Sequence, residues 1–238
     1  MGAFFVGKKS KTGLIQAAEP HKALALRKEQ EMQTPNTTPK EWANPTPAGL
    51  AALAVACVCF FALLTGRVGT DALPLIGCWL LGGFVVQLIV GLCDLKSGSV
   101  AGGNAFIFFC AFFMLVSGLE MIMKYLAIRA GTPLDIRIDG YVWAALAAVL
   151  ILWTPAFCKQ FSLLSVIIVL IDAALPFIAL VDLGLIPARL THVSAWLLLG
   201  AALVAIYHCG AMVVNAVYGR AVYPLPGAAK SSKKTTAK

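Results

Sequence analysis

Residues 72–92 read ALPLIGCWLLGGFVVQLIVGL, and this stretch decides the fold. It contains no charged residue and a single side-chain amide, that of Gln87. An α-helix needs about 20 mostly apolar residues to cross the ~30 Å hydrocarbon core of a bilayer. A helix also satisfies its own backbone hydrogen bonds there, where no water is present to do so. The stretch therefore predicts a transmembrane helix.

Working outward, five further stretches are equally apolar, and the six predicted spans are 47 to 65, 72 to 92, 101 to 127, 141 to 158, 161 to 183 and 192 to 218. Charged or helix-breaking residues separate them, including Asp94 to Gly98 and Arg129 to Gly140. Connections this short make neighbouring helices antiparallel. The predicted fold class is an all-α polytopic membrane protein with six transmembrane helices in a compact bundle.

The composition excludes other classes of protein. Of the 238 residues 60% are apolar and 13% are charged, with a mean hydropathy of +0.84. A soluble domain has about 45–50% apolar and about 25% charged residues. The net charge of +8 is concentrated in the two ends of the chain and not on an amphipathic face. The expected partner is therefore the lipid bilayer and not a nucleic acid.

Three regions follow from this pattern. Residues 1–43 are polar and predict a flexible N-terminal tail, residues 44–226 predict a six-helix transmembrane domain, and residues 227–238 predict a basic C-terminal tail. An even number of spans places both tails on one side of the membrane. Because positive charge favours the cytoplasmic side, we expect a multi-pass protein of the cell (plasma or inner) membrane with both termini cytoplasmic.

Few groups within the spans could carry chemistry. The ionisable ones are Glu120, Lys124, Asp172 and His208. The chain has no HExxH or GxSxG motif, and its seven cysteines lack CxxC spacing, so we expect no enzyme activity, no cofactor and no metal. Intramembrane charges often mark routes for substrates or protons. Asp172, His208 and Glu120 are therefore candidates for proton coupling.

Each of these groups also has a structural interpretation. Glu120 and Lys124, four residues apart, either form an interfacial ion pair or line a vestibule that attracts anions through Lys124. Asp172 is either protonated and hydrogen-bonded to another helix or exposed to water, with His208 as a candidate partner. His208 is a satisfied core histidine or a proton relay.

Small and polar residues mark two further places. Gly83, Gln87 and Gly91 form one stripe of the second span, which either packs against another helix or points Gln87 into a pore. Gly102-Gly103-Asn104 opens the third span, where free backbone amides lie at the positive end of the helix dipole.

The stretch Asn44–Leu50, NPTPAGL, begins the first span. Pro45 and Pro47 suit the first turn of a helix because they lack an N–H group that would be unpaired there. Asn44 can cap the helix, and the remaining free amides can attract an anion such as a carboxylate. Capping alone explains the pattern equally well.

Three sequence blocks resemble a known family. NPTPAGL resembles the NPxPxGL signature of the acetate uptake transporter family, the YaaH-like acetate/succinate permeases and their fungal relatives. Residues 91–106, GLCDLKSGSVAGGNAF, with Phe112-Phe113, are similar to the family's GLxExxxGNTFGxTAFxxxxxFW stretch. Residues 206–224, IYHCGAMVVNAVYGRAVYP, are similar to its closing IYxxxxxxLNExFGRxxLP. The chain departs from the family at Ser99, in place of an asparagine, at Met212, in place of a glutamate, and at Phe109, in place of a tyrosine.

The resemblance implies a six-helix protomer with its own permeation path and a homo-oligomer, a hexamer in the family. The implied substrate is acetate or another short-chain carboxylate, succinate included, moved in a proton-linked or channel-like way. Residues expected along the substrate path are Asn44, Pro45, Pro47, Gly49, Leu50, Leu53, Gln87, Asn104, Phe106 and Phe109. Two alternatives stay open, which are a channel for a small neutral solute such as ammonia and a non-transporting membrane sensor or assembly subunit.

Overall fold

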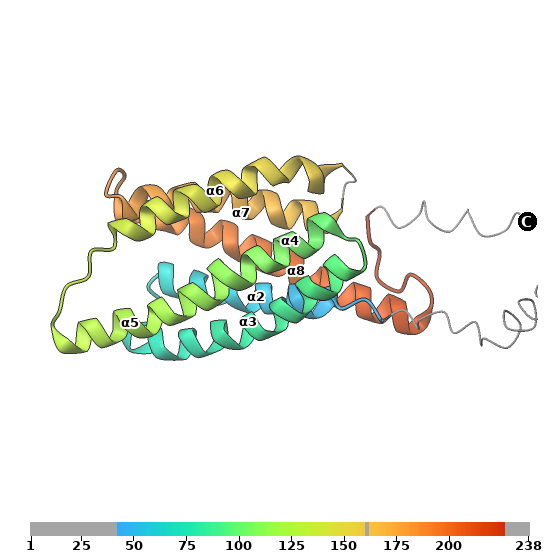
Figure 1. Cartoon of the computed structure of the whole chain (residues 1–238), viewed down its shortest axis with the longest axis horizontal. Helices are drawn as coiled ribbons and strands as arrows, with labels where there is room; N and C mark the ends of the chain where they lie inside the picture. The colour runs from blue at the N-terminus through green and yellow to red at the C-terminus, as the bar shows by residue number, and fades with distance from the viewer. Residues whose placement is uncertain (1–41, 160–161, 227–238) are drawn as a thin grey trace, which may run out of the picture. The chain divides into compact units, whose positions relative to one another are not determined.

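The computed structural model describes residues 42–159 and 162–226, so nearly all of both predicted tails lies outside the described residues. The described part contains six continuous helical spans that are long and apolar enough to cross a membrane (Figure 1). Their bounds are Thr46–Leu64, Thr70–Lys96, Val100–Ala130, Arg137–Cys158, Leu163–Asp182 and Ala188–Tyr218. This confirms the predicted all-α fold with six spans.

Three of the spans consist of more than one element. The first, fourth and fifth are the single helices α2 (Thr46–Leu64), α6 (Arg137–Cys158) and α7 (Leu163–Asp182). The second joins a 3-10 turn, η2 (Thr70–Ala72), to α3 (Leu73–Lys96), and the sixth joins η4 (Ala188–Leu190) to α8 (Thr191–Tyr218). The third runs without a break through α4 (Val100–Phe108), a π-helical segment η3 (Phe109–Val116) and α5 (Ser117–Ala130).

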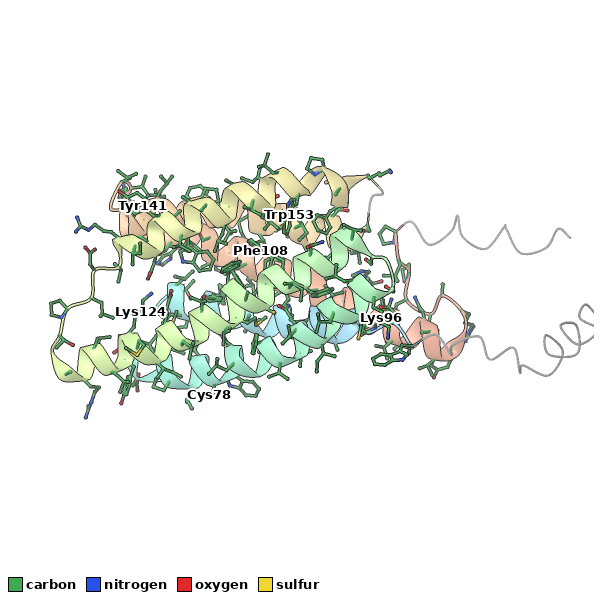
Figure 2. All side chains as sticks on the ribbon, in the orientation of Figure 1. Cys78, Lys96, Phe108, Lys124, Tyr141 and Trp153 are labelled. Atoms are coloured by element: carbon green, nitrogen blue, oxygen red, sulfur yellow. The ribbon has the colours of Figure 1, made fainter. Side chains whose placement is uncertain are left out.

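The spans pack as a ring. α6 packs on α7, α7 on α8, α8 on α2, α2 on α3, and α3 on the third span. The ring closes where the third span meets α6 through two aromatic pairs, Phe113 with Trp143 and Phe108 with Trp153 (Figure 2). Contact between the third span and α6 is otherwise sparse. This seam is therefore the weakest side of the ring.

Large apolar side chains fill the interior of the ring. Those with less than 2% of their surface exposed include Leu50, Phe109, Phe113, Leu150, Ile171 and Leu198, which come from five of the six spans. Apolar side chains on the outer surface, such as Trp79 at 65% and Leu75 at 67% exposed, are in the place where lipid would cover them. The spans are thus apolar all round, as the sequence predicts.

Two predicted boundaries are wrong. Asp94, expected in a connection, lies in the last turn of α3 and is buried, because the helix continues to Lys96. Arg137 to Gly140, also expected in a connection, form the first turn of α6. In both places the polar residues have partners within the bundle, so their polarity does not end the helix.

Candidate functional site

The first turn of α2 is built by the NPTPAGL stretch. The Asn44 Oδ1 atom accepts a hydrogen bond from the Thr46 backbone N–H at 2.9 Å, Pro45 is the N-cap residue in place of the expected Asn44, and Pro47 is the second residue of the helix. Asn44 is exposed, whereas Gly49 and Leu50 are buried. The stretch thus leads from the bundle surface into its interior within one and a half turns.

A buried carboxylate connects this turn to the second sequence block. The Thr46 hydroxyl donates to Asp94 Oδ1 at 3.5 Å, and the Asp94 carbonyl accepts from the Ser97 hydroxyl at 2.8 Å and the Ser99 N–H at 2.9 Å. Gly98, with φ of +84°, makes the reversal between α3 and α4. Gly103 then lets α4 approach α3, since a Cβ atom there would lie 2.8 Å from the Leu95 backbone nitrogen.

The third block folds back on α8. Asn215 Oδ1 accepts from the backbone N–H groups of Val222 and Tyr223 at 2.7 and 2.9 Å, and its Nδ2 donates to the Tyr223 carbonyl. The Tyr207 hydroxyl donates to the Pro224 carbonyl at 2.8 Å. These bonds hold residues 219–226 against the last turns of α8, which accounts structurally for the spacing of this block.

The three blocks meet at one end of the bundle. α2 and α4 begin there and α3 ends there, as the bonds of Thr46 and Ser99 to Asp94 require. α8 passes beside the start of α2, because Ala51 and Ile206 line one groove, and its last turns extend beyond that level at the same end (Figure 1). We call this end the first mouth.

Below the first mouth lie three buried apolar side chains that are expected along the substrate path, those of Leu53, Phe106 and Phe109, which we call the collar. Their exposed fractions are 2%, 4% and 2%. Phe106 lies directly on Gly49, where an added Cβ atom would be 2.5 Å from its Cε1 atom. Phe113 packs on Phe60 further along the same two helices, with ring centroids 5.0 Å apart, so Leu53 and Phe109 fall between these two levels.

Gln87 is the hydrogen-bonding side chain at the level of the collar. It is fully buried, and its Nε2 donates to the Gly49 carbonyl at 3.1 Å, while its Oε1 is buried and finds no partner within residues 42–159 and 162–226. The rest of its stripe packs against the third span, since Cβ atoms on Gly83 and Gly91 would press on Met114 and Ile107. The stripe is therefore a packing face that also presents one unpaired acceptor.

The π-helical segment η3 was not foreseen. It begins at Phe109 of the collar, and the Ser117 hydroxyl donates to the Phe112 carbonyl at 3.1 Å at its far end. π-Helical segments in α-helices are rare and frequently lie at functional sites. The residue types in Phe109–Val116 do not predict a π-helix, because these apolar side chains fit an α-helix equally well.

Asn104 lies apart from the collar. The third span begins at Val100, so Asn104 is in its second turn and not at its start as predicted. Its side chain is exposed and donates to the Val100 carbonyl at 2.8 Å. The Asn104 amide therefore supports its own helix, and in this conformation it does not join Gln87 or Phe106.

Asp172 and His208 are not in contact, although the sequence made His208 a candidate partner of Asp172. The Ser194 hydroxyl of α8 donates to the Ala174 carbonyl of α7 at 2.8 Å, which sets the register of these antiparallel helices. His208 then lies about 18 Å beyond the level of Asp172, at 1.5 Å rise per residue. Asp172 instead contacts the Thr154 hydroxyl of α6, which also donates to the Leu150 carbonyl. Asp172 Oδ1 and His208 Nδ1 are buried and have no partner among the described residues.

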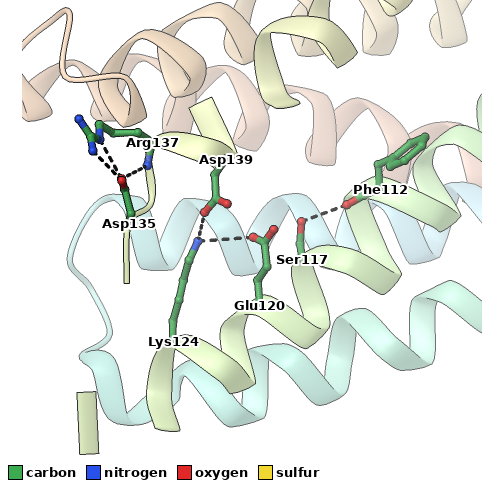
Figure 3. Close-up of polar contacts among 7 residues, drawn as sticks. All are labelled: Phe112, Ser117, Glu120, Lys124, Asp135, Arg137 and Asp139. Carbon is green, nitrogen blue, oxygen red and sulfur yellow. Dashed lines mark hydrogen bonds and ion pairs between the residues drawn. The ribbon is translucent and has the colours of Figure 1, made fainter. Parts of the chain in front are cut away.

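The opposite end of the third span carries an ion-pair cluster (Figure 3). Lys124 Nζ lies 3.4 Å from Glu120 Oε2, the pair expected from the sequence, and 2.7 Å from Asp139 Oδ2 of α6. Two carboxylates therefore lie within ion-pair distance of one ammonium group, which favours the ion pair over an anion-attracting vestibule.

The described residues contain no group of three His, Cys, Asp or Glu side chains that could hold a metal ion. Among solved structures, the chain resembles the bacterial acetate channel SatP, with a TM-score of 0.63 and 20% sequence identity, over 77% of this chain and 99% of that chain. No protein-family model matches the chain, and no curated protein matches it. The six-helix architecture of this protein is therefore that of a known channel.

Proposed function

We propose that the chain moves acetate or a similar short-chain carboxylic acid across a membrane, through the ring of its six helices. The observation that carries the proposal is the collar of Leu53, Phe106 and Phe109 with the unpaired Gln87 acceptor beside it, within a fold that resembles an acetate channel. Asn44, Pro45, Pro47, Gly49 and Leu50 lead to the collar from the first mouth.

The chemistry of the collar favours the neutral acid over the carboxylate anion. Removing a charge from water without a partner costs several kcal/mol even after the protein relaxes. The collar offers apolar side chains and no charged group of its own. A protonated carboxylic acid keeps one O–H donor, and the Gln87 Oε1 atom is an acceptor without a partner. We therefore assign to Gln87 the recognition of the acid at the narrowest point.

Passage requires the collar to open, because its three side chains are almost completely buried. The π-helical segment that begins at Phe109 offers a place for this movement. A return of Phe109–Val116 to α-helical register would rotate Phe109 and Phe113 about the helix axis. Asp172, Glu120 and His208 remain the candidates for linking this movement to a proton.

The proposal includes a homo-oligomer, a hexamer as in the family that the sequence resembles. An apolar groove of about 370 Å³ lies where α2 meets α3 and α8, and Val55, Val58, Trp79 and Ile206 line it with 40–65% of their surface exposed. A second copy of the chain would cover these side chains. Native mass spectrometry of the detergent-solubilised protein would give the number of copies. The proposal also keeps both termini on the cytoplasmic side.

The experiment is uptake of labelled acetate into proteoliposomes with and without an imposed pH gradient. We expect uptake above that of protein-free liposomes, competition by propionate or lactate, and a loss of uptake in Phe109→Trp, whose larger ring overfills the collar. The matched control is Leu203→Trp, since Leu203 lies on the outer surface of α8 at 59% exposure. Flux of ammonia that short acids do not compete would instead indicate a neutral-solute channel, and absence of any flux would indicate a sensor or assembly subunit.

A further inference from the structure

A cluster of three charged side chains, Glu120, Lys124 and Asp139, lies at the seam between the third span and α6, the weakest side of the ring. Lys124 of α5 bonds to Asp139 of α6 at 2.7 Å, and it reaches back to Glu120 at 3.4 Å (Figure 3). The side chains of Lys124, Glu120 and Asp139 are 27%, 30% and 13% exposed. They are therefore neither sealed in the core nor freely solvated. The polar link between α5 and α6 runs through the Lys124 ammonium group.

Two cavities meet at this link. The outer cavity, about 180 Å³, is lined by Glu120, Met123, Lys124, Ile136 and Asp139 among others. The inner cavity, only about 20 Å³, is lined by the buried Ser117, by Glu120, Asp139, Trp143 and Leu146, and by Phe112, Val116 and Val142, which are 40–44% exposed. Glu120 and Asp139 line both cavities, so the two cavities adjoin at these side chains.

A chain of aromatic rings leads from the inner cavity to the collar. Trp143 lies against Phe113, with ring centroids 5.9 Å apart, and Phe113 lies against Phe109 of the collar at 5.7 Å. Lys124 and the first-mouth residue Lys96 lie toward opposite ends of the bundle (Figure 2). The cluster is therefore placed where a path that starts at the first mouth and passes the collar would leave the bundle.

We propose that Glu120, Lys124 and Asp139 form a latch that closes the second mouth of the path. In the closed state the Lys124 ammonium group holds the end of α5 against the first turn of α6, and the inner cavity is too small for an organic acid. When the bond from Lys124 to Asp139 breaks, α5 and α6 separate and the two cavities join. Partly exposed ion pairs are weak, so thermal motion suffices to open and close such a contact. This inference rests on the proposed transport function.

The test measures opening separately from transport. Ser117 lines the inner cavity and is 1% exposed, so a cysteine at this position reports on access from the second mouth. The reactivity of Ser117→Cys toward a membrane-impermeant methanethiosulfonate is compared with that of the parent chain, which corrects for the native cysteines. We expect almost no added reactivity with the latch intact, and a rise of about fivefold with Lys124→Met, the factor that loss of one such ion pair gives.

Two further variants make the test specific. The exchange Lys124→Asp with Asp139→Lys keeps an ion pair between α5 and α6 and should restore the low reactivity, which also shows that the bundle is folded. Asp135→Asn removes the neighbouring ion pair of Asp135 with Arg137, which is exposed, joins two residues at the start of α6 and does not reach α5, and should change nothing.

The outcomes separate the latch from the proposed substrate. A rise in Ser117→Cys reactivity with Lys124→Met that the exchanged pair reverses supports the latch, whether or not acetate moves. If it rises and no variant transports acetate, the latch stands and the proposed function fails. If acetate moves and Lys124→Met has the same reactivity as Asp135→Asn, the latch is overturned.

Discussion

Gln87 of α3 donates its side-chain amide to the Gly49 carbonyl of α2 at 3.1 Å, at the level where the Phe106 ring covers Gly49. One bond thus fixes the orientation of the amide beside the collar and leaves Oε1 as a buried acceptor without a partner. Leaving a buried polar atom unpaired costs about 1–3 kcal/mol. An acid in the path that donates its O–H to Oε1 would recover part of this free energy.

We expect Gln87→Leu to reduce the initial rate of acetate uptake by about tenfold, the factor that corresponds to one lost hydrogen bond of ~1.4 kcal/mol. Leucine fills a similar volume but accepts no hydrogen bond from the acid. The measurement is initial uptake in proteoliposomes at equal amounts of reconstituted protein. Gly82→Ala is the control, because Gly82 lies on the same helix and its Cβ atom would meet nothing within 4 Å. Unchanged uptake in Gln87→Leu would remove Gln87 from the path.

Two variants of Asn44 distinguish a role in stabilising the start of α2 from a role in attracting the substrate. Asn44→Ala removes the acceptor of the Thr46 N–H group and should lower acetate uptake without lowering the abundance of the protein in the membrane. Asn44→Asp keeps the acceptor and suits the positive end of the helix dipole, but it adds a negative charge at the first mouth. We expect Asn44→Asp to transport less than the parent chain while its thermal stability is retained. Parent-like uptake in Asn44→Asp would mean that Asn44 only caps α2.

The sequence predicts the spans and the start of α2 well, because both depend on local patterns. Continuous apolar stretches identify all six spans, and Asn44 with two prolines predicts the start of α2 within a residue. The second and third sequence blocks, residues 91–106 and 206–224, also lie at one end of the bundle. The bonds of Asp94 and Asn215 show that residues of both blocks stabilise the segments that follow α3 and α8.

The rest depends on contacts between helices that no spacing reveals. The predicted partner of Lys124 was Glu120, four residues away, yet its shorter bond is to Asp139 on the next helix, across the connection from α5 to α6. Likewise, the register of α7 and α8 separates Asp172 from His208, and Thr154 of α6 becomes the neighbour of Asp172. The π-helical segment has the same composition as the α-helices around it.

Two glycines allow a test of the packing of α3 against α4. A Cβ atom on Gly103 would lie 2.8 Å from the Leu95 backbone nitrogen, which cannot rotate away. We expect Gly103→Ala to destabilise the bundle by about 1–3 kcal/mol, as overpacking does in other cores. The same change at Gly82 should be neutral or slightly stabilising, since alanine favours the helix and finds open space. Thermal unfolding of the two purified variants in detergent measures the difference, and equal midpoints would contradict the close packing.

The carboxyl group of Asp135 should not contribute to the pH dependence of uptake. The Arg137 guanidinium group donates to both Asp135 oxygens, at 2.8 and 2.6 Å, and lowers the pKa of Asp135 to about 2. Because this pKa lies below its usual value of about 3.9, the contribution of the pair to stability is complete above that usual value and disappears only as the pH falls through about 2. We therefore expect Asp135→Asn to leave the shape of the pH profile of uptake unchanged between about pH 5 and 8. A shifted profile would mean that the carboxyl of Asp135 titrates in this range.

Asp172 offers the sharpest test of proton linkage among the candidates. Its carboxyl group contacts the Thr154 hydroxyl, and its Oδ1 atom is buried without a partner in the middle of α7. Asparagine has nearly the same shape and can keep the contact with Thr154, but it cannot gain or lose a proton. We expect the increase in the rate of acetate uptake on imposing an inward pH gradient to be smaller in Asp172→Asn than in the parent chain, because the acid then takes its proton only from solution.

The control for this prediction is Thr154→Val, which removes the hydroxyl partner of Asp172 and leaves the carboxyl group in place. It should keep its response to the gradient, although with an altered rate. The neutral acid can itself respond to pH, so both variants are compared with protein-free liposomes of the same lipid. If Asp172→Asn responds to the gradient as the parent chain does, the proton crosses with the acid or by way of Glu120 or His208, and the carboxyl group of Asp172 serves only to join α6 to α7.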